Sequence, residues 1–293
     1  MKNRPLLYTL IGVAIVAVSF GAILIRLAEN VPVLSIAAWR LGVSFLLLIP
    51  FSWRKSPLKT MSRRDLFLSV ASGVFLTLHF ILWISSLRYT SVASSVVLVS
   101  TNPIFVALGV RFVFKESLSR TLVVATLLSV AGAALIGWGD FRISGAALSG
   151  DLLALGGAVM ASGYFLIGRR VRQRVPLSTY ILTTYGTAAI LLLGVALATH
   201  QQLIGFPKLT YLYLILLAVG PQLIGHSTFN WALKYLSAST VAILILGEPV
   251  ASTLLAYLIL GEGVTLLKVI GAGVILSGIY LSLHEEAYDE DRG

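Results

Sequence analysis

Residues 121–138 read TLVVATLLSVAGAALIGW, a run in which no side chain is charged. As a helix this run would rise about 27 Å, close to the hydrocarbon thickness of a bilayer, about 30 Å. Its apolar residues do not alternate with polar ones, as the strands of a membrane barrel would. Backbone groups in lipid must be satisfied within the segment, so the run predicts a membrane-spanning helix.

The rest of the chain repeats this pattern. Of its 293 residues, 57% are hydrophobic and 12% are charged, and the mean hydropathy is +0.93. A soluble domain carries about 25% charged residues, so these values predict an all-α membrane protein. Ten apolar runs predict ten transmembrane helices, near residues 6–25, 34–52, 66–87, 92–114, 121–138, 152–168, 178–198, 209–233, 239–260 and 266–284.

The first run follows Lys2 and Arg4, as the core of a secretory signal would. It is longer than a typical signal core, and no small-residue cleavage site follows it before Arg26. We therefore expect it to be a retained first span.

The net charge of +10 comes from 22 Lys and Arg residues against 12 acidic ones. Most basic residues, including the runs at 54–64 and 169–174, would lie on one side if the N-terminus is inside. The positive-inside rule then predicts a multi-pass protein of the inner (cytoplasmic) membrane with both termini cytoplasmic. Lipid is the expected partner of this chain, and nucleic acid is not.

The acidic tail, 285–293, is expected to be a disordered cytoplasmic end.

An internal repeat divides the chain. A shift of 146 residues places Tyr89 on Tyr235 and Pro103 on Pro249. Each half holds five predicted spans, an odd number, so the second half would enter the membrane in the opposite orientation. Inverted repeats of this kind give many secondary transporters alternating access to a site near the membrane midplane.

Particular motifs add to this pattern. The sequence Ser-Ala-Ser-Thr at 237–240, Leu-Gly-Glu-Pro at 246–249 and Leu-Gly-Glu at 260–262 resembles the EamA-type domain of the drug/metabolite transporter superfamily. The first half has Asn102-Pro103 where the second half has Glu248-Pro249. Because Asn replaces Glu there, the two halves are not chemically equivalent.

The resemblance covers nearly the whole chain as two domains, 1–138 and 150–284. It implies a transporter, not an enzyme, that exports or exchanges small metabolites without ATP. Within the superfamily the chain is most similar to the YddG-type amino-acid exporters, which favour aromatic substrates. The chain has no cysteine, which excludes thiolate metal sites, and we expect neither a metal nor a cofactor.

Polar side chains in hydrocarbon are costly, so each one is a candidate for function. His79 and Trp83 lie four residues apart near the middle of span three and therefore share a helix face. His226 and Asn230 repeat this spacing in span eight. Two facing stripes of this kind would line a substrate cavity with aromatic surface and hydrogen-bonding groups, although each His could instead cap a backbone carbonyl.

Further aromatic residues could complete the wall of this cavity. They are Trp39, Tyr164 and Tyr185. A Trp or Tyr that lies away from the middle of its span would instead anchor the protein at the membrane interface.

Glu248 is the most conspicuous acid in the apolar part of the chain. It could couple a proton to transport, or it could have a structural or gating role, which its uncharged counterpart Asn102 favours. Pro103 and Pro249 each remove a helical hydrogen bond, so they could act as bending points of a gate or as simple kinks. Arg40 could reach the membrane surface, pair with a carbonyl or hold a substrate carboxylate.

These residues predict a secondary transporter that exports amino acids, aromatic or other bulky ones in particular. A nucleotide-sugar or phosphorylated-sugar antiporter would need several basic cavity residues, and only Arg40 and Arg111 lie well inside predicted spans, away from their ends. A membrane-embedded lipid-modifying enzyme would need clustered acids or a nucleophile with a base, and no such motif occurs.

Small residues recur every four positions in span five, at Ala125, Ser129, Ala133 and Gly137. Such a stripe permits close helix packing. The packing could lie within a monomer or between two chains.

Overall fold

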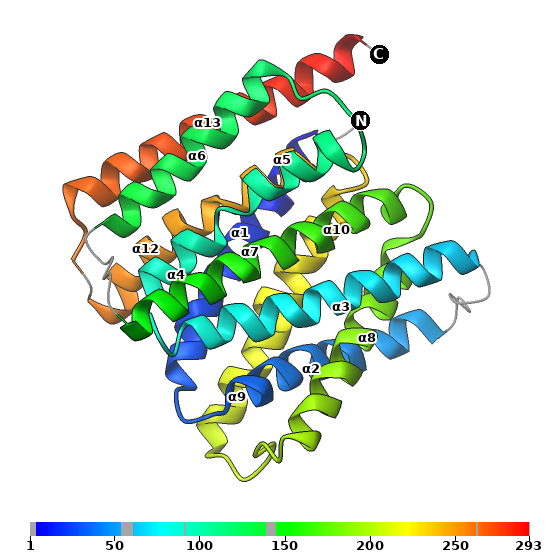
Figure 1. The fold of residues 1–293 in the computed structure, drawn as a ribbon, viewed down its shortest axis with the longest axis vertical. Coiled ribbons are helices and arrows are strands. Elements are labelled where there is room, and N and C mark those ends of the chain that lie inside the picture. The colour runs from blue at the N-terminus through cyan, green and yellow to red at the C-terminus, as the bar shows by residue number, and fades with distance from the viewer. Residues whose placement is uncertain (1–3, 54–60, 91, 139–144, 262, 293) are drawn as a thin grey trace.

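The computed structural model describes residues 4–53, 61–90, 92–138, 145–261 and 263–292. In this part of the chain every regular element is helical (Figure 1). In chain order the elements are α1 (Arg4–Leu27), α2 (Val33–Trp53), α3 (Arg63–Ser86), α4 (Val92–Val99), α5 (Asn102–Phe112), α6 (Arg120–Gly137), α7 (Gly145–Arg172), α8 (Leu177–Ala198), α9 (Lys208–Leu217), the π-helix η3 (Ala218–His226), α10 (Ser227–Ala232), α11 (Ala238–Ile245), α12 (Gly247–Leu260) and α13 (Leu266–Arg292).

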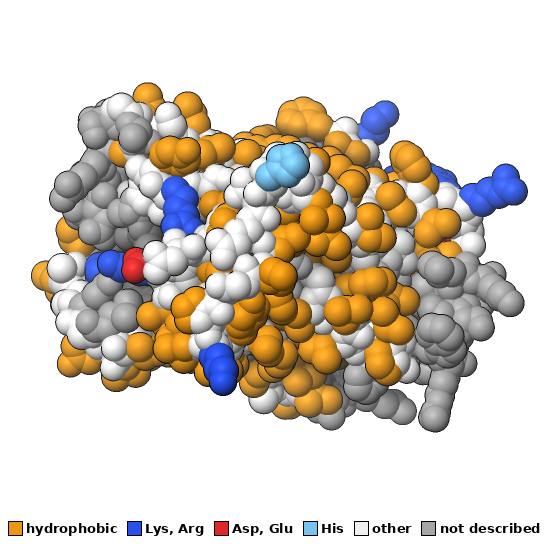
Figure 2. All heavy atoms as spheres, turned by 90° about the horizontal axis from the view of Figure 1, so that it is seen from below, with side chains coloured by type: hydrophobic (Ala, Val, Ile, Leu, Met, Phe, Trp, Pro, Cys, Tyr) orange, Lys and Arg blue, Asp and Glu red, His pale blue; other side chains and the backbone are white. Residues whose placement is uncertain are grey.

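Ten helical segments of the described chain are long and apolar enough to cross a membrane. They coincide with the ten predicted runs to within a few residues, so the prediction of an all-α, ten-span membrane protein is confirmed. Spans four, eight and nine each consist of more than one helix, namely α4–α5, α9–η3–α10 and α11–α12. Hydrophobic side chains are spread over the middle of the face shown in Figure 2, where few charged side chains lie among them.

The predicted orientation in the membrane stays a prediction. The first and last helices have their outer ends at the same end of the bundle (Figure 1), as an even number of spans requires. The basic residues at 54–60 that contribute to the charge asymmetry lie outside the described residues.

Spans four and nine are interrupted at equivalent positions. α4 ends at Val99 and α11 ends at Ile245, which the 146-residue shift superimposes. Four residues further on, Pro103 and Pro249 have no N–H group with which to continue the helical hydrogen bonding. The shared proline therefore explains why both spans break at the same point.

Span eight differs from its counterpart, span three. α3 is continuous, whereas Ala218–His226 form a π-helix that contains Pro221. Phe75 occupies the position in α3 that corresponds to Pro221. The missing N–H of the proline disturbs the regular α-helical bonding, and π-helical turns of this kind frequently occur at functional sites.

The final spans of the two halves, α6 and α13, pack against each other along much of their length (Figure 1). A Cβ atom added at Gly132 would lie 2.6 Å from the carbonyl oxygen of Gly271, and one at Gly278 would lie 2.7 Å from that of Ala125. The two backbones approach this closely only because the contact positions have little or no side chain. The small-residue stripe is therefore used within one chain.

The prediction of a disordered tail is wrong, because α13 continues as a helix through Arg292. The carboxylate of Glu286 accepts a hydrogen bond from the backbone N–H of Ser237, at 2.8 Å, and one from the hydroxyl of Thr240, at 2.6 Å. The tail thus caps the first turn of α11. The acidic composition of the tail gave no sign of these partners, which are distant in sequence.

Candidate functional site

A cavity of about 50 Å³ lies between the two halves of the bundle. Both helix breaks open onto it, since Val99 and Asn102 line it from one break and Ile245 and Glu248 line it from the other. Since an enclosed water molecule needs about 10–15 Å³ by this measure, the cavity has room for a few water molecules. This arrangement places the polar ends of broken helices at the centre of the bundle, as in many transporters.

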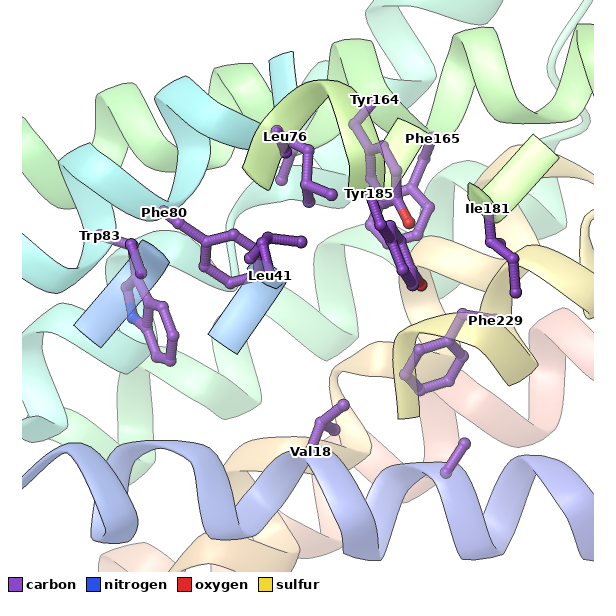
Figure 3. Close-up of a cluster of buried hydrophobic side chains, with 14 of the residues drawn as sticks. Val18, Leu41, Leu76, Phe80, Trp83, Tyr164, Phe165, Ile181, Tyr185 and Phe229 are labelled. Carbon is purple, nitrogen blue, oxygen red and sulfur yellow. The ribbon is translucent and has the colours of Figure 1, made fainter. Parts of the chain in front are cut away.

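Aromatic rings form much of the cavity wall. Figure 3 shows Phe80 and Trp83 on α3 and Tyr164 and Phe165 on α7, with Val18 directed toward this cluster from α1. Trp83, Tyr164 and Phe165 line the cavity directly. The wall therefore offers apolar surface on which a planar or bulky group can pack.

Arg40 lines the cavity and is only 1% exposed. Its Nε donates a hydrogen bond to Oε1 of Gln222 at 2.9 Å, and its guanidinium carbon lies 4.2 Å from the ring centroid of Phe80. Its Nη1 is buried and has no hydrogen-bond partner among the described residues. Arg40 therefore does not reach the membrane surface in this structure, and the carbonyl with which it pairs is the side-chain amide of Gln222.

His79 combines the two roles that the sequence left open. Its Nδ1 lies 2.9 Å from the carbonyl oxygen of Gly157, and because a carbonyl can only accept, Nδ1 carries the proton. The same ring lines the cavity and stacks on Trp83, with centroids 6.0 Å apart and planes at 7°. The indole Nε1 of Trp83 is buried and has no partner in the described chain.

The span-eight stripe is split between the cavity and the layer behind it. His226 lines the cavity, and its Nδ1 has no hydrogen-bond partner among the described residues. Asn230 does not line the cavity; its Nδ2 donates to the hydroxyl of Tyr164 and to the carbonyl of His226. Tyr185 also lies behind the lining, beside Tyr164 (Figure 3), with its hydroxyl 3.2 Å from that of Ser227. Asn230 and Tyr185 therefore support the wall and are not part of it.

Trp39 lies away from the cavity. Its Nε1 donates a hydrogen bond to the carbonyl of Leu203 at 2.8 Å, and its ring contacts Tyr211 edge-on at 5.3 Å. It faces an apolar groove that residues of α2 and α8 form. Neighbouring residues of a helix point about 100° apart, so Trp39 and Arg40 lie on different faces of α2. Pro103 and Pro249 are buried beside the two breaks but do not line the cavity either.

Two residues of the site were missed by reasoning from the sequence. Gln222 is the hydrogen-bond partner of Arg40, and Phe80 provides the ring against which Arg40 packs. A polar residue next to Pro221 in the middle of a span was a signal for Gln222. The 146-residue shift, which places Phe80 on His226, was a signal for Phe80.

Ten spans in two similar halves, with a cavity of aromatic and unpaired polar groups between them, define a membrane transporter of the inverted-repeat class. Residues 4–138 and 148–284 each match the EamA-like transporter family, and the chain belongs to that family. The predicted EamA-type membership is thereby confirmed, while the finer similarity to YddG-type exporters stays a prediction.

Several proteins are similar to this chain. An uncharacterized transporter of Bacillus subtilis is 25% identical over 255 residues, which cover 84% of this chain and 82% of that protein. An uncharacterized transporter of Archaeoglobus fulgidus is 26% identical over 287 residues, or 96% of this chain and 98% of that protein. A protein of Salmonella typhimurium named "Probable amino-acid metabolite efflux pump" is 27% identical over 186 residues, or 60% of this chain and 62% of that protein.

A crystal structure of a protein that is 20% identical superposes with a TM-score of 0.81. The superposition covers 98% of this chain and 99% of that chain. At this level of identity the likeness shows a shared fold only.

Proposed function

We propose that the protein is a secondary transporter that exports amino acids, in particular aromatic or other bulky ones, by alternating access around the central cavity. The observation that carries this proposal is the cavity itself, in which aromatic rings surround Arg40 and Glu248 at the junction of the two repeats. Membership of a transporter family supports the mode of action, and the name of the Salmonella relative supports the substrate class.

Alternating access requires the helices around the cavity to move, because the present volume of about 50 Å³ is too small for a bulky amino acid. The two breaks are suitable hinges, since a helix bends most easily where its hydrogen bonding is already interrupted. We therefore assign the gate to the segments around Pro103 and Pro249.

The two rival functions are less well supported. A nucleotide-sugar or phosphorylated-sugar antiporter would need several cations around the phosphates, but Arg111 is exposed near the end of α5 and is not part of the cavity lining. A lipid-modifying enzyme is disfavoured because the EamA-like family consists of transporters.

The orientation can be tested with single cysteines, because the chain has none of its own. We expect both termini to be cytoplasmic in the inner membrane. In intact cells a membrane-impermeant maleimide should then label Lys208→Cys, at the start of α9, and should not label Lys234→Cys, after α10. The reverse pattern would contradict the proposed orientation.

The substrate can be tested by counterflow of labelled amino acids into proteoliposomes, with and without a pH gradient. We expect aromatic amino acids to compete best. A panel in which no amino acid competes while a nucleotide sugar does would overturn the proposal.

If proton coupling occurs through Glu248, the Glu248→Gln variant should lose the pH dependence of uptake. Full retention of that dependence would exclude Glu248 as the coupling group.

A further inference from the structure

Two opposite charges face the same cavity from different repeats. Arg40 comes from α2 in the first half, and Glu248 comes from the first turn of α12 in the second half. The two groups are close enough to interact electrostatically, yet neither is in an ion pair within the described chain. A gap therefore separates the guanidinium from the carboxylate.

The position of Arg40 explains why the gap does not close. The hydrogen bond from Nε to Gln222 and the contact with the Phe80 ring hold the guanidinium against span eight and α3. Nη1 is left buried without an acceptor. Burying a charged N–H donor without a partner is costly, so an acceptor is missing from this side of the cavity.

Two acceptors in the cavity lining are without a donor. Glu248 is buried only in part, and no hydrogen bond to its carboxylate is formed among the described residues. Its counterpart Asn102 lines the cavity from the other break, and its Oδ1 is buried without a partner. Two acceptors thus face the cavity from equivalent helix starts, and both need a donor.

A ligand that satisfies both sides must carry an anionic acceptor at one end and a cationic donor at the other. A carboxylate matches Arg40, because the guanidinium can donate to both of its oxygens, and the unpaired indole Nε1 of Trp83 adds a further donor. An ammonium group matches Glu248 and Asn102, because it supplies three donors and no acceptor.

We propose that the cavity recognises a zwitterionic α-amino acid at both ends, with Arg40 and Trp83 on the carboxylate and Glu248 and Asn102 on the ammonium group. This inference rests on the proposed function and specifies its substrate. The stacked rings of His79 and Trp83 then form the surface on which the side chain of the amino acid packs. A solute that lacks either charge leaves one buried group unpaired and is rejected.

The test compares L-phenylalanine with two analogues, phenethylamine, which lacks the carboxylate, and 3-phenylpropionate, which lacks the ammonium group. Binding to the purified full-length protein is measured by calorimetry. We expect phenylalanine to bind about a hundredfold more tightly than either analogue, since a site built for a polar group strongly rejects a ligand without it.

Two variants then test the recognition of each charged end of the ligand separately. Glu248→Gln should bind phenylalanine more weakly and 3-phenylpropionate more tightly than the wild type does. Arg40→Gln should show the opposite crossover, with improved binding of phenethylamine. Damage to the fold would weaken the binding of all three ligands together. Opposite changes for two ligands therefore report on the site and not on the fold. Glu116→Gln and Arg111→Gln, which change exposed residues outside the cavity lining, are matched controls that should preserve the wild-type ratios.

The outcomes distinguish this inference from the proposed function. If phenylalanine binds but Glu248→Gln shows no crossover, the assignment of the two ends is overturned and amino-acid transport stands. Equal binding of phenylalanine and phenethylamine by the wild type would also overturn the assignment of the two ends, and this result needs no variant. If the wild type binds no amino acid at all, both the inference and the proposed substrate class fail.

Discussion

The α6–α13 pair and the central cavity are both built from equivalent parts of the two repeats, but only the former keeps their symmetry. The 146-residue shift places Ala125 on Gly271 and Gly132 on Gly278. The close contact between Gly132 and Gly271 therefore has a symmetry mate in the contact between Gly278 and Ala125, and the structure contains both.

The cavity contains different side chains at equivalent positions. Asn102 faces it from one helix break and Glu248 from the other, and His226 lines it, whereas the equivalent residue of the first half, Phe80, is not part of the lining. Packing two like helices requires like shapes, which a duplication supplies. Binding a solute with unlike ends requires unlike groups, which only divergence of the two copies can supply.

The largest expected effect concerns the symmetric region. Gly271→Val places a side chain against the backbone of α6, so α6 and α13 must separate or distort, at a cost of about 3 kcal/mol. We expect little folded protein, as judged by yield and thermal unfolding in detergent. Gly273→Val, on an exposed face of α13 with no atom within 4 Å of the added Cβ, is the control and should behave as the wild type does.

The next prediction breaks the asymmetry of the cavity without changing its net charge. Exchanging the two residues, Asn102→Glu with Glu248→Asn, moves the carboxylate to the other helix break. Mispositioning a charge that must pair within the cavity costs several kcal/mol, so we expect amino-acid uptake to fall roughly a hundredfold. Each single variant is measured alongside. Uptake at the wild-type rate would mean that the position of the acid relative to Arg40 is unimportant.

A smaller effect is expected from the residue that positions Arg40. Gln222→Leu removes the acceptor of its Nε at similar side-chain volume, and an unsatisfied buried donor costs about 1.5 kcal/mol, roughly a tenfold effect. We expect the KM of uptake to rise tenfold with little change in the maximal rate. Gln201→Leu, on the loop before α9, serves as the control. An unchanged KM would show that Phe80 alone holds the guanidinium.

The smallest effect is expected at the α13 tail, which has no role in the cavity. Glu286→Ala removes the cap of α11 and should lower stability by about 1 kcal/mol, with uptake kinetics close to those of the wild type. Its neighbour Glu285→Ala is the matched control. Thermal unfolding compares the two variants, and equal melting temperatures would refute the capping role.

Much of the fold could be predicted because span length and hydrophobicity are local properties of the chain. The runs of apolar residues placed all ten spans, and the repeated proline located the breaks of spans four and nine. The candidate site was predicted only in part. His79 and Trp83 were placed on one face by their spacing, whereas the inward turn of Arg40 and the outward turn of Trp39 depend on how α2 is rotated against its neighbours.

The amino-acid sequence by itself therefore determined a ten-span membrane protein with a duplicated architecture, because lipid leaves a helix as the only open-ended choice for each apolar run. Tertiary structure alone decided which polar side chains meet. The contacts of Arg40 with Gln222 and of Glu286 with α11 join residues far apart in the chain. No local pattern encodes them, because the rotation and close approach of each helix are set by packing against all of its neighbours.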